Sequence, residues 1–209
     1  MLPSLAAVSA TALACSAAAA PVALVNGSFE DENIGFITSA NASPQPVPGF
    51  DVVFLPGGGF YGTDNSRASD PAVDGSNDFY FKNIALTTDA GDRPAAAAGE
   101  EYSLLFSGRT EGAGPGITAA IEFFDASGTL IGSESDTFLA TAPAFNYQQN
   151  LSLAGAIAPT NTASVGIRIE NLGTDQTINV DDLRVDVIPE PGSLALLGLG
   201  AFALLRRRA

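Results

Sequence analysis

The segment Ser164–Glu170 reads Ser-Val-Gly-Ile-Arg-Ile-Glu and alternates apolar side chains with small or charged ones. Val165, Ile167 and Ile169 would share one face of an extended chain, because successive side chains of a strand point to opposite sides. The other face is left for solvent. This period of two predicts an antiparallel strand that covers a core on one side only.

The same period recurs along the rest of the chain, in segments 101–107, 116–125 and 145–153. In the last of these, Tyr147, Leu151 and Leu153 have the same parity as Phe145. Turn-forming runs such as Asp-Ala-Ser-Gly at 125–128 separate the segments, and no amphipathic helical pattern lies between them. The sequence therefore predicts an all-β fold, a two-sheet antiparallel β-sandwich.

The last predicted strand, 178–187, changes phase in its middle. Ile178 and Val180 have one parity, whereas the apolar residues after Asp182 have the other. A strand changes phase through a bulge or a break, which we place at Asp181 and Asp182. On a regular strand Asp182 would point inward with Val180, and a bound cation would offset the high cost of burying its carboxylate.

Three short segments carry a resemblance to a known fold. They are Asn-Gly-Ser-Phe-Glu at 26–30, Pro-Gly-Phe at 48–50 and Val-Asp-Asp-Leu at 180–183. Together they resemble the galactose-binding-like jelly rolls, a fold that many carbohydrate-binding modules share. The family often has tryptophan where this chain has Phe50.

That resemblance spans about residues 22–187, and it implies a jelly-roll sandwich domain at 21–188. It also implies a structural calcium that joins the first and last strands, with Glu30 and either Asp181 or Asp182 as ligands. The alternative is that these acidic residues are solvated turn residues.

A sugar site typically combines an aromatic platform with a few fixed polar groups. The chain has no tryptophan. We therefore consider Tyr61, with Asp64 and Asn65 nearby, and Tyr147 as possible ligand-binding residues. The alternative is that both tyrosines pack in the core or in loops.

The composition argues against catalysis and against nucleic-acid binding. The chain has no histidine, and its single cysteine, Cys15, lies near the N-terminus, which excludes Ser-His and Cys-His nucleophiles. Hydrolysis by paired carboxylates stays open as the least favoured alternative, a glycoside hydrolase. A net charge of −14 would repel nucleic acid. We predict a protein that is not an enzyme.

Residues 1–20 are apolar and rich in alanine, and they end in small residues. This composition predicts a signal peptide that signal peptidase removes, although the usual basic residues at its start are absent. A lipoprotein signal at Cys15 is disfavoured, because Leu13 lies one position too close to the cysteine.

Residues 189–209 form a second terminal signal with three parts. Pro189, Glu190 and Pro191 end the preceding strand, the run 192–205 is apolar apart from glycine and serine, and the basic cluster follows. That cluster consists of Arg206, Arg207 and Arg208. The apolar run would form a transmembrane helix of about 21 Å, against a hydrocarbon core of about 30 Å. Its length favours transient insertion over permanent anchoring.

This three-part arrangement resembles the PEP-CTERM sorting signal of Gram-negative bacteria, and an ordinary tail anchor is the alternative. The resemblance implies that an exosortase cleaves near Pro189–Pro191 and sends the protein to the cell envelope or outside. Because hosts of this family commonly make exopolysaccharide, we expect a non-catalytic surface or extracellular-matrix protein associated with biofilm polysaccharide. The alternative is a lectin-like carbohydrate-binding module.

Overall fold

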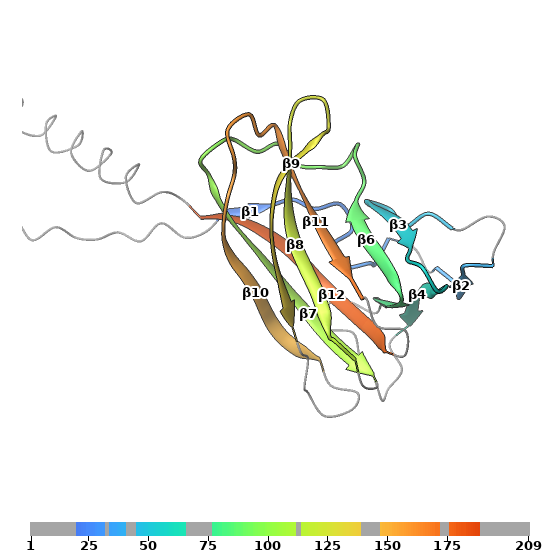
Figure 1. Ribbon diagram of the computed structural model, residues 1–209. Coiled ribbons are helices and arrows are strands. Elements are labelled where there is room, and N and C mark those ends of the chain that lie inside the picture. The colour runs from blue at the N-terminus through green and yellow to red at the C-terminus, as the bar shows by residue number, and fades with distance from the viewer. Residues whose placement is uncertain are drawn as a thin grey trace, which may run out of the picture.

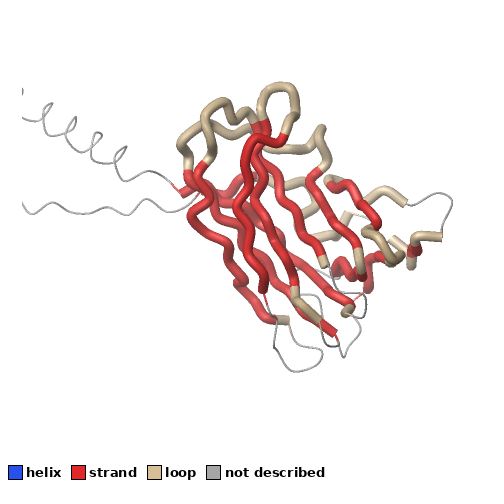
Figure 2. The backbone as a smooth tube through the Cα atoms, viewed as in Figure 1, coloured by secondary structure: helices blue, strands red, loops and turns tan. Residues whose placement is uncertain are grey.

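The computed structural model describes residues 20–31, 34–40, 45–65, 77–111, 114–138, 147–171 and 176–188. These residues form strands joined by turns and loops, with no helix among them (Figure 2). The predicted all-β class is thus confirmed for this part of the chain. The predicted signal peptide, apart from Ala20, and the predicted tail at 189–209 lie outside the described residues.

Within the described ranges, no helix has the length and apolar character needed to cross a membrane.

The strands form two antiparallel sheets, which Figure 1 shows as the layers of a sandwich. The seven-stranded sheet has the order β10-β7-β12-β5-β4-β2, and β1 also pairs with β12. Its strands are β1 (Ala20–Val22), β2 (Ile37–Thr38), β4 (Phe60–Asn65), β5 (Asn77–Lys82), β7 (Glu101–Glu111), β10 (Gln148–Ile157) and β12 (Thr177–Ile188). The five-stranded sheet has the order β3-β6-β11-β8-β9. Its strands are β3 (Phe50–Phe54), β6 (Ile84–Thr88), β8 (Ile117–Phe124), β9 (Leu130–Phe138) and β11 (Ser164–Glu170).

The core lies between the inner faces of the two sheets. Val165, Ile167 and Ile169 of β11 are all 0% exposed, as their shared parity predicts. On β7, Tyr102 and Leu104 are buried to the same extent. The alternation along each strand therefore places one set of side chains in the core and leaves the other on an outer face.

The predicted change of phase in β12 is confirmed. Its register against β7 shifts between Asp181 and Arg184, and Asp182 has a φ of 50°. The bulge turns Asp182 to the surface, so no inward-facing carboxylate is needed there. Asp181 is instead the buried one, at 0% exposure on the outer face of the sheet.

The shared face predicted for Tyr147 and Leu151 is wrong. The register of β10 against β7 shifts between Gln148 and Leu151, where Asn150 has a φ of 58°. Leu151 faces the core, whereas Tyr147 contacts Arg109 on the outer face of the seven-stranded sheet. An irregularity between two residues cancels any argument from their parity.

Candidate functional site

Three side chains from separate strands form a polar row on the outer face of the seven-stranded sheet. Asn179 on β12 lies directly opposite Tyr80 on β5 and directly opposite Arg109 on β7. Directly opposite residues of antiparallel strands share a face. Tyr80, Asn179 and Arg109 therefore lie side by side, and we call them the polar row.

Asp78 and Tyr147 complete the network around this row. The Tyr147 hydroxyl donates to Oδ2 of Asp78. The Asn179 side-chain amide donates to the same oxygen at 2.9 Å. The Arg109 guanidinium lies 5.4 Å from the centre of the Tyr147 ring, and its Nη2 lies 2.9 Å from Oε1 of Glu111. Asp78, Arg109 and Asn179 are each at most 4% exposed, so this polar network is nearly dry.

The electrostatics of the network keep Tyr147 in its neutral form. Burial raises the pKa of the Tyr147 hydroxyl strongly, and the neighbouring Asp78 carboxylate raises it further, while Arg109 opposes the shift. The hydroxyl therefore stays protonated and acts as a hydrogen-bond donor. The arrangement holds Asp78 as a fixed acceptor rather than as a free acid or base.

The outer face of the five-stranded sheet carries a second candidate, a hollow of about 160 Å³. It is lined by Thr118, Ala120, Glu122, Ser133, Ser135, Arg168 and Glu170. Ala120 pairs with Arg168 on one side and Ser135 on the other, so a small side chain lies between two larger ones.

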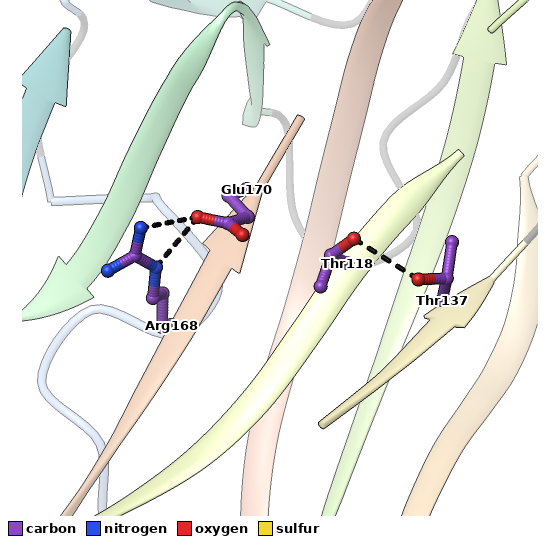
Figure 3. Close-up of polar contacts among 4 residues, drawn as sticks. All are labelled: Thr118, Thr137, Arg168 and Glu170. Carbon is purple, nitrogen blue, oxygen red and sulfur yellow. Dashed lines mark hydrogen bonds and ion pairs between the residues drawn. The ribbon is translucent and has the colours of Figure 1, made fainter. Parts of the chain in front are cut away.

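The polar groups of this hollow are held by contacts along and across strands (Figure 3). Arg168 donates through Nε at 2.8 Å and through Nη2 at 2.5 Å to Oε2 of Glu170. The hydroxyls of Thr118 and Thr137 lie 3.3 Å apart. Burial raises the pKa of Glu122, and Arg168 and Arg93 oppose that shift. The hollow thus presents hydroxyls and a paired guanidinium to solvent.

The residues predicted to bind a ligand do not come together in one place. Tyr61 is 0% exposed and donates its hydroxyl to the Gln45 carbonyl at 2.7 Å, so its ring is core and offers no open platform. Asp64 and Asn65 lie on β4 opposite Asp78 and Asn77, and their side chains lie outside the described structure. Tyr147 is half-buried within the network of the polar row.

The residues expected to hold calcium are Glu30, which follows the N-terminal turn, and Asp181 or Asp182 in the bulge of β12. The Leu183 amide donates to the Gly27 carbonyl at 2.9 Å, which joins the turn to the bulge. Glu30 accepts the Asn77 amide at 2.6 Å through Oε1, and Oδ1 of Asp181 accepts the Asp182 amide at 2.8 Å.

The oxygen atoms near this junction supply only part of the ligand set that a cation such as calcium needs. Among the described residues, no three acidic side chains gather as a metal-binding group. Oδ1 of Asn77 is buried and has no hydrogen-bond partner in the described structure, so an oxygen acceptor stands open beside Glu30. Asp182 points to solvent. Glu30 and the Asn77 amide oxygen lie together, whereas Asp181 is buried on the outer face of the sheet.

Sequence reasoning missed Asp78, Arg109 and Asn179. Asn179 alternates with Ile178 and Val180, so a polar outer face on β12 is visible in the sequence. What the sequence does not show is which strands lie beside β12, and the polar row exists only through that pairing.

Residues 187–209 match the PEP-CTERM protein-sorting motif. The match shows the sorting signal that the tail predicts, and it implies an exported cell-envelope protein that an exosortase processes. No curated protein matches the chain in sequence.

Solved structures share the fold at low sequence identity. A cyclase from Fischerella sp. TAU is 14% identical with a TM-score of 0.59, over 83% of this chain and 98% of that one. The arabinose-bound MgGH51 α-L-arabinofuranosidase is 12% identical with a TM-score of 0.52, over 80% of this chain and 26% of that one. At these identities the likeness shows the sandwich fold and no activity.

The CBM22-1 xylan-binding domain from Paenibacillus barcinonensis Xyn10C is 13% identical with a TM-score of 0.44, over 83% of this chain and 99% of that one.

Proposed function

We propose that this chain is a non-catalytic surface or extracellular-matrix protein of a Gram-negative bacterium, associated with exopolysaccharide. The observation that carries the proposal is the sorting motif at residues 187–209, which begins as the last strand, β12, ends at Ile188. Cleavage near Pro189–Pro191 would therefore leave every described strand in place. The apolar run 192–205 would hold the protein in the inner membrane until then.

The non-catalytic part of the proposal is supported by how the acidic groups are held. Asp78 accepts hydrogen bonds from Tyr147 and Asn179, and Glu170 is paired with Arg168. A glycoside hydrolase needs two carboxyl groups facing one substrate bond. Glu122 and Glu170 both line the hollow on the five-stranded sheet, but Glu170 is held in an ion pair with Arg168.

The test is the mass of the mature protein from its native host. We expect the envelope or secreted form to end near Pro189–Pro191, and deletion of the exosortase to leave an intact chain in the membrane fraction. A double substitution of Pro189 and Pro191 to alanine should have the same effect as the deletion. A mature protein that retains Arg208 in a host with active exosortase would contradict the proposal.

A second candidate is a carbohydrate-binding module, and the hollow on the five-stranded sheet favours it. Hydroxyls of Thr118, Ser133 and Ser135 and the guanidinium of Arg168 suit a ligand rich in hydroxyl groups. Arg168→Ala should then weaken glycan binding, with the exposed Ile157→Ala as the control. Equal binding by both variants would exclude the hollow as a sugar site.

A further inference from the structure

Three aromatic rings gather on the outer face of the seven-stranded sheet, near its β2 edge. The rings of Phe36 and Phe60 lie 5.1 Å apart, and those of Phe60 and Tyr80 lie 6.2 Å apart. Phe36 and Tyr80 are nearly parallel, with centres 6.5 Å apart and an interplanar angle of 15°. We call Phe36, Phe60 and Tyr80 the aromatic shelf.

The backbone of β4 lets the Tyr80 ring lie close to the sheet. Gly62 is directly opposite Tyr80, and a Cβ at Gly62 would lie 2.7 Å from the Tyr80 hydroxyl oxygen and 2.9 Å from Cζ. A side chain at this position would push the Tyr80 ring away from the sheet. The sequence of β4 thus builds a flat aromatic surface rather than an ordinary polar strand face.

The shelf is open to solvent, unlike the aromatic core behind it. Phe36 is 59% exposed and Phe60 and Tyr80 are partly exposed, whereas Tyr61 and Phe79 on the same strands are 0% exposed. Exposed aromatic rings stay in contact with water, which is unfavourable, whereas the rings in the core are shielded from it. Core packing therefore does not explain the shelf.

A fixed amide side chain, that of Asn179, lies beside the shelf. Asn179 lies directly opposite Tyr80 and is 3% exposed. Its Nδ2 donates a hydrogen bond to Oδ2 of Asp78 at 2.9 Å. That bond fixes the orientation of the amide. Oδ1 of Asn179 is buried and has no hydrogen-bond partner in the described part of the chain. The Asn179 amide is therefore a fixed, buried group beside the ring of Tyr80, and the open surface at this point is the aromatic shelf itself.

We propose that the aromatic shelf binds the pyranose ring of a neutral polysaccharide. The apolar C–H face of the sugar stacks on Phe36 and Tyr80. The chain carries a net charge of −14, and Asp78 lies beside the row, so a uronic acid polymer would be repelled. The inference rests on the proposed export, which brings the domain to polysaccharide, and it uses a surface separate from the hollow.

The experiment measures binding of the purified full-length protein to cellohexaose, xylohexaose and mannohexaose, with trigalacturonic acid as the anionic probe. We expect binding of at least one neutral hexaose and a loss of about tenfold or more in Phe36→Ala. Because Phe36 is exposed, this variant should have the same melting temperature as the parent protein. Phe36→Tyr should restore binding, Ile157→Ala should leave it unchanged, and Arg168→Ala tests the hollow.

Four outcomes would overturn the inference. They are no binding of any neutral hexaose, equal loss in Ile157→Ala, binding lost in Arg168→Ala but kept in Phe36→Ala, and self-association that Phe36→Ala abolishes. The last would assign the shelf to a second copy of the chain. The mass of the mature C-terminus tests export separately, so either proposal can fail without the other.

Discussion

The Tyr61 hydroxyl shows how one buried polar atom contributes to the stability of the core. It donates to the Gln45 carbonyl at 2.7 Å, and burial raises the pKa of Tyr61, so it remains a donor. We expect Tyr61→Phe to lower the free energy of unfolding by about 1–2 kcal/mol, because the carbonyl loses its donor. Tyr61→Ala should cost about 3–5 kcal/mol, because it also leaves a cavity.

Equilibrium urea unfolding of the two variants measures both losses. A Tyr61→Phe protein as stable as the parent would show that water replaces the hydroxyl at Gln45.

Glu122 gives a prediction about pH. Burial is the main cause that raises its pKa from the ordinary 4.5, against the opposing effect of Arg168 and Arg93. A raised pKa means that the folded protein binds this proton more tightly than the unfolded chain does. The stability from that proton is fully present below pH 4.5 and is lost as the pH rises through the raised pKa.

Glu122→Gln should therefore gain stability relative to the parent at pH 7 and lose that advantage at pH 4. Melting temperatures measured across this range test the sign. An advantage for the parent at pH 7 would mean that the attraction of Arg168 outweighs burial.

The contact between the N-terminal turn and the bulge of β12 is a property of two elements. The Leu183 amide donates to the Gly27 carbonyl at 2.9 Å, and a Cβ on Gly27 would lie 2.4 Å from the Leu183 carbonyl oxygen. Gly27→Ala should destabilise the domain by about 1–3 kcal/mol, because two backbones must separate. Gly35→Ala is the matched control, since a Cβ at Gly35 meets nothing within 4 Å.

Chemical denaturation compares these two alanine variants. Equal stability would show that the turn can move away from the bulge at no cost, and that the contact does not hold the first segment to the last strand.

The strands and the bulge could be predicted from sequence because alternation is local. The burial of Val165, Ile167 and Ile169 could be predicted without knowing which strands pair with theirs. The same holds for the change of phase at Asp181. The prediction for Tyr147 was wrong because an irregularity at Asn150 breaks the period, and nothing in the residue types marks it.

At the scale of the whole molecule, the predictable part is what the chain encodes locally. The sorting motif at 187–209 is contiguous, so it could be recognised without a fold. The network around the polar row joins Asp78 to Asn179 across 101 residues of sequence, and the aromatic shelf depends on the pairing of β4 with β5. Sites of this kind follow from strand order, which the alternation of single strands does not determine.

The junction of the chain's two ends gives the last prediction. Glu30 follows the N-terminal turn, Asp181 lies in the final strand, and Asn77 presents a buried amide oxygen beside Glu30. A calcium ion bound there would link the first and last segments and stabilise only the folded state. At a calcium concentration one hundred times its Kd, the gain would be about 2.7 kcal/mol, or roughly 5–11 °C in melting temperature.

Melting curves in EDTA and in excess calcium test this link. We expect EDTA to lower the melting temperature, calcium to restore it, and Glu30→Gln to remove the difference between the two conditions. Asp182→Asn is the matched control, because this carboxylate points to solvent and its loss should leave the response to calcium intact. Identical melting of the parent protein in EDTA and calcium would mean that hydrogen bonds alone, such as that from Leu183 to Gly27, join the two ends.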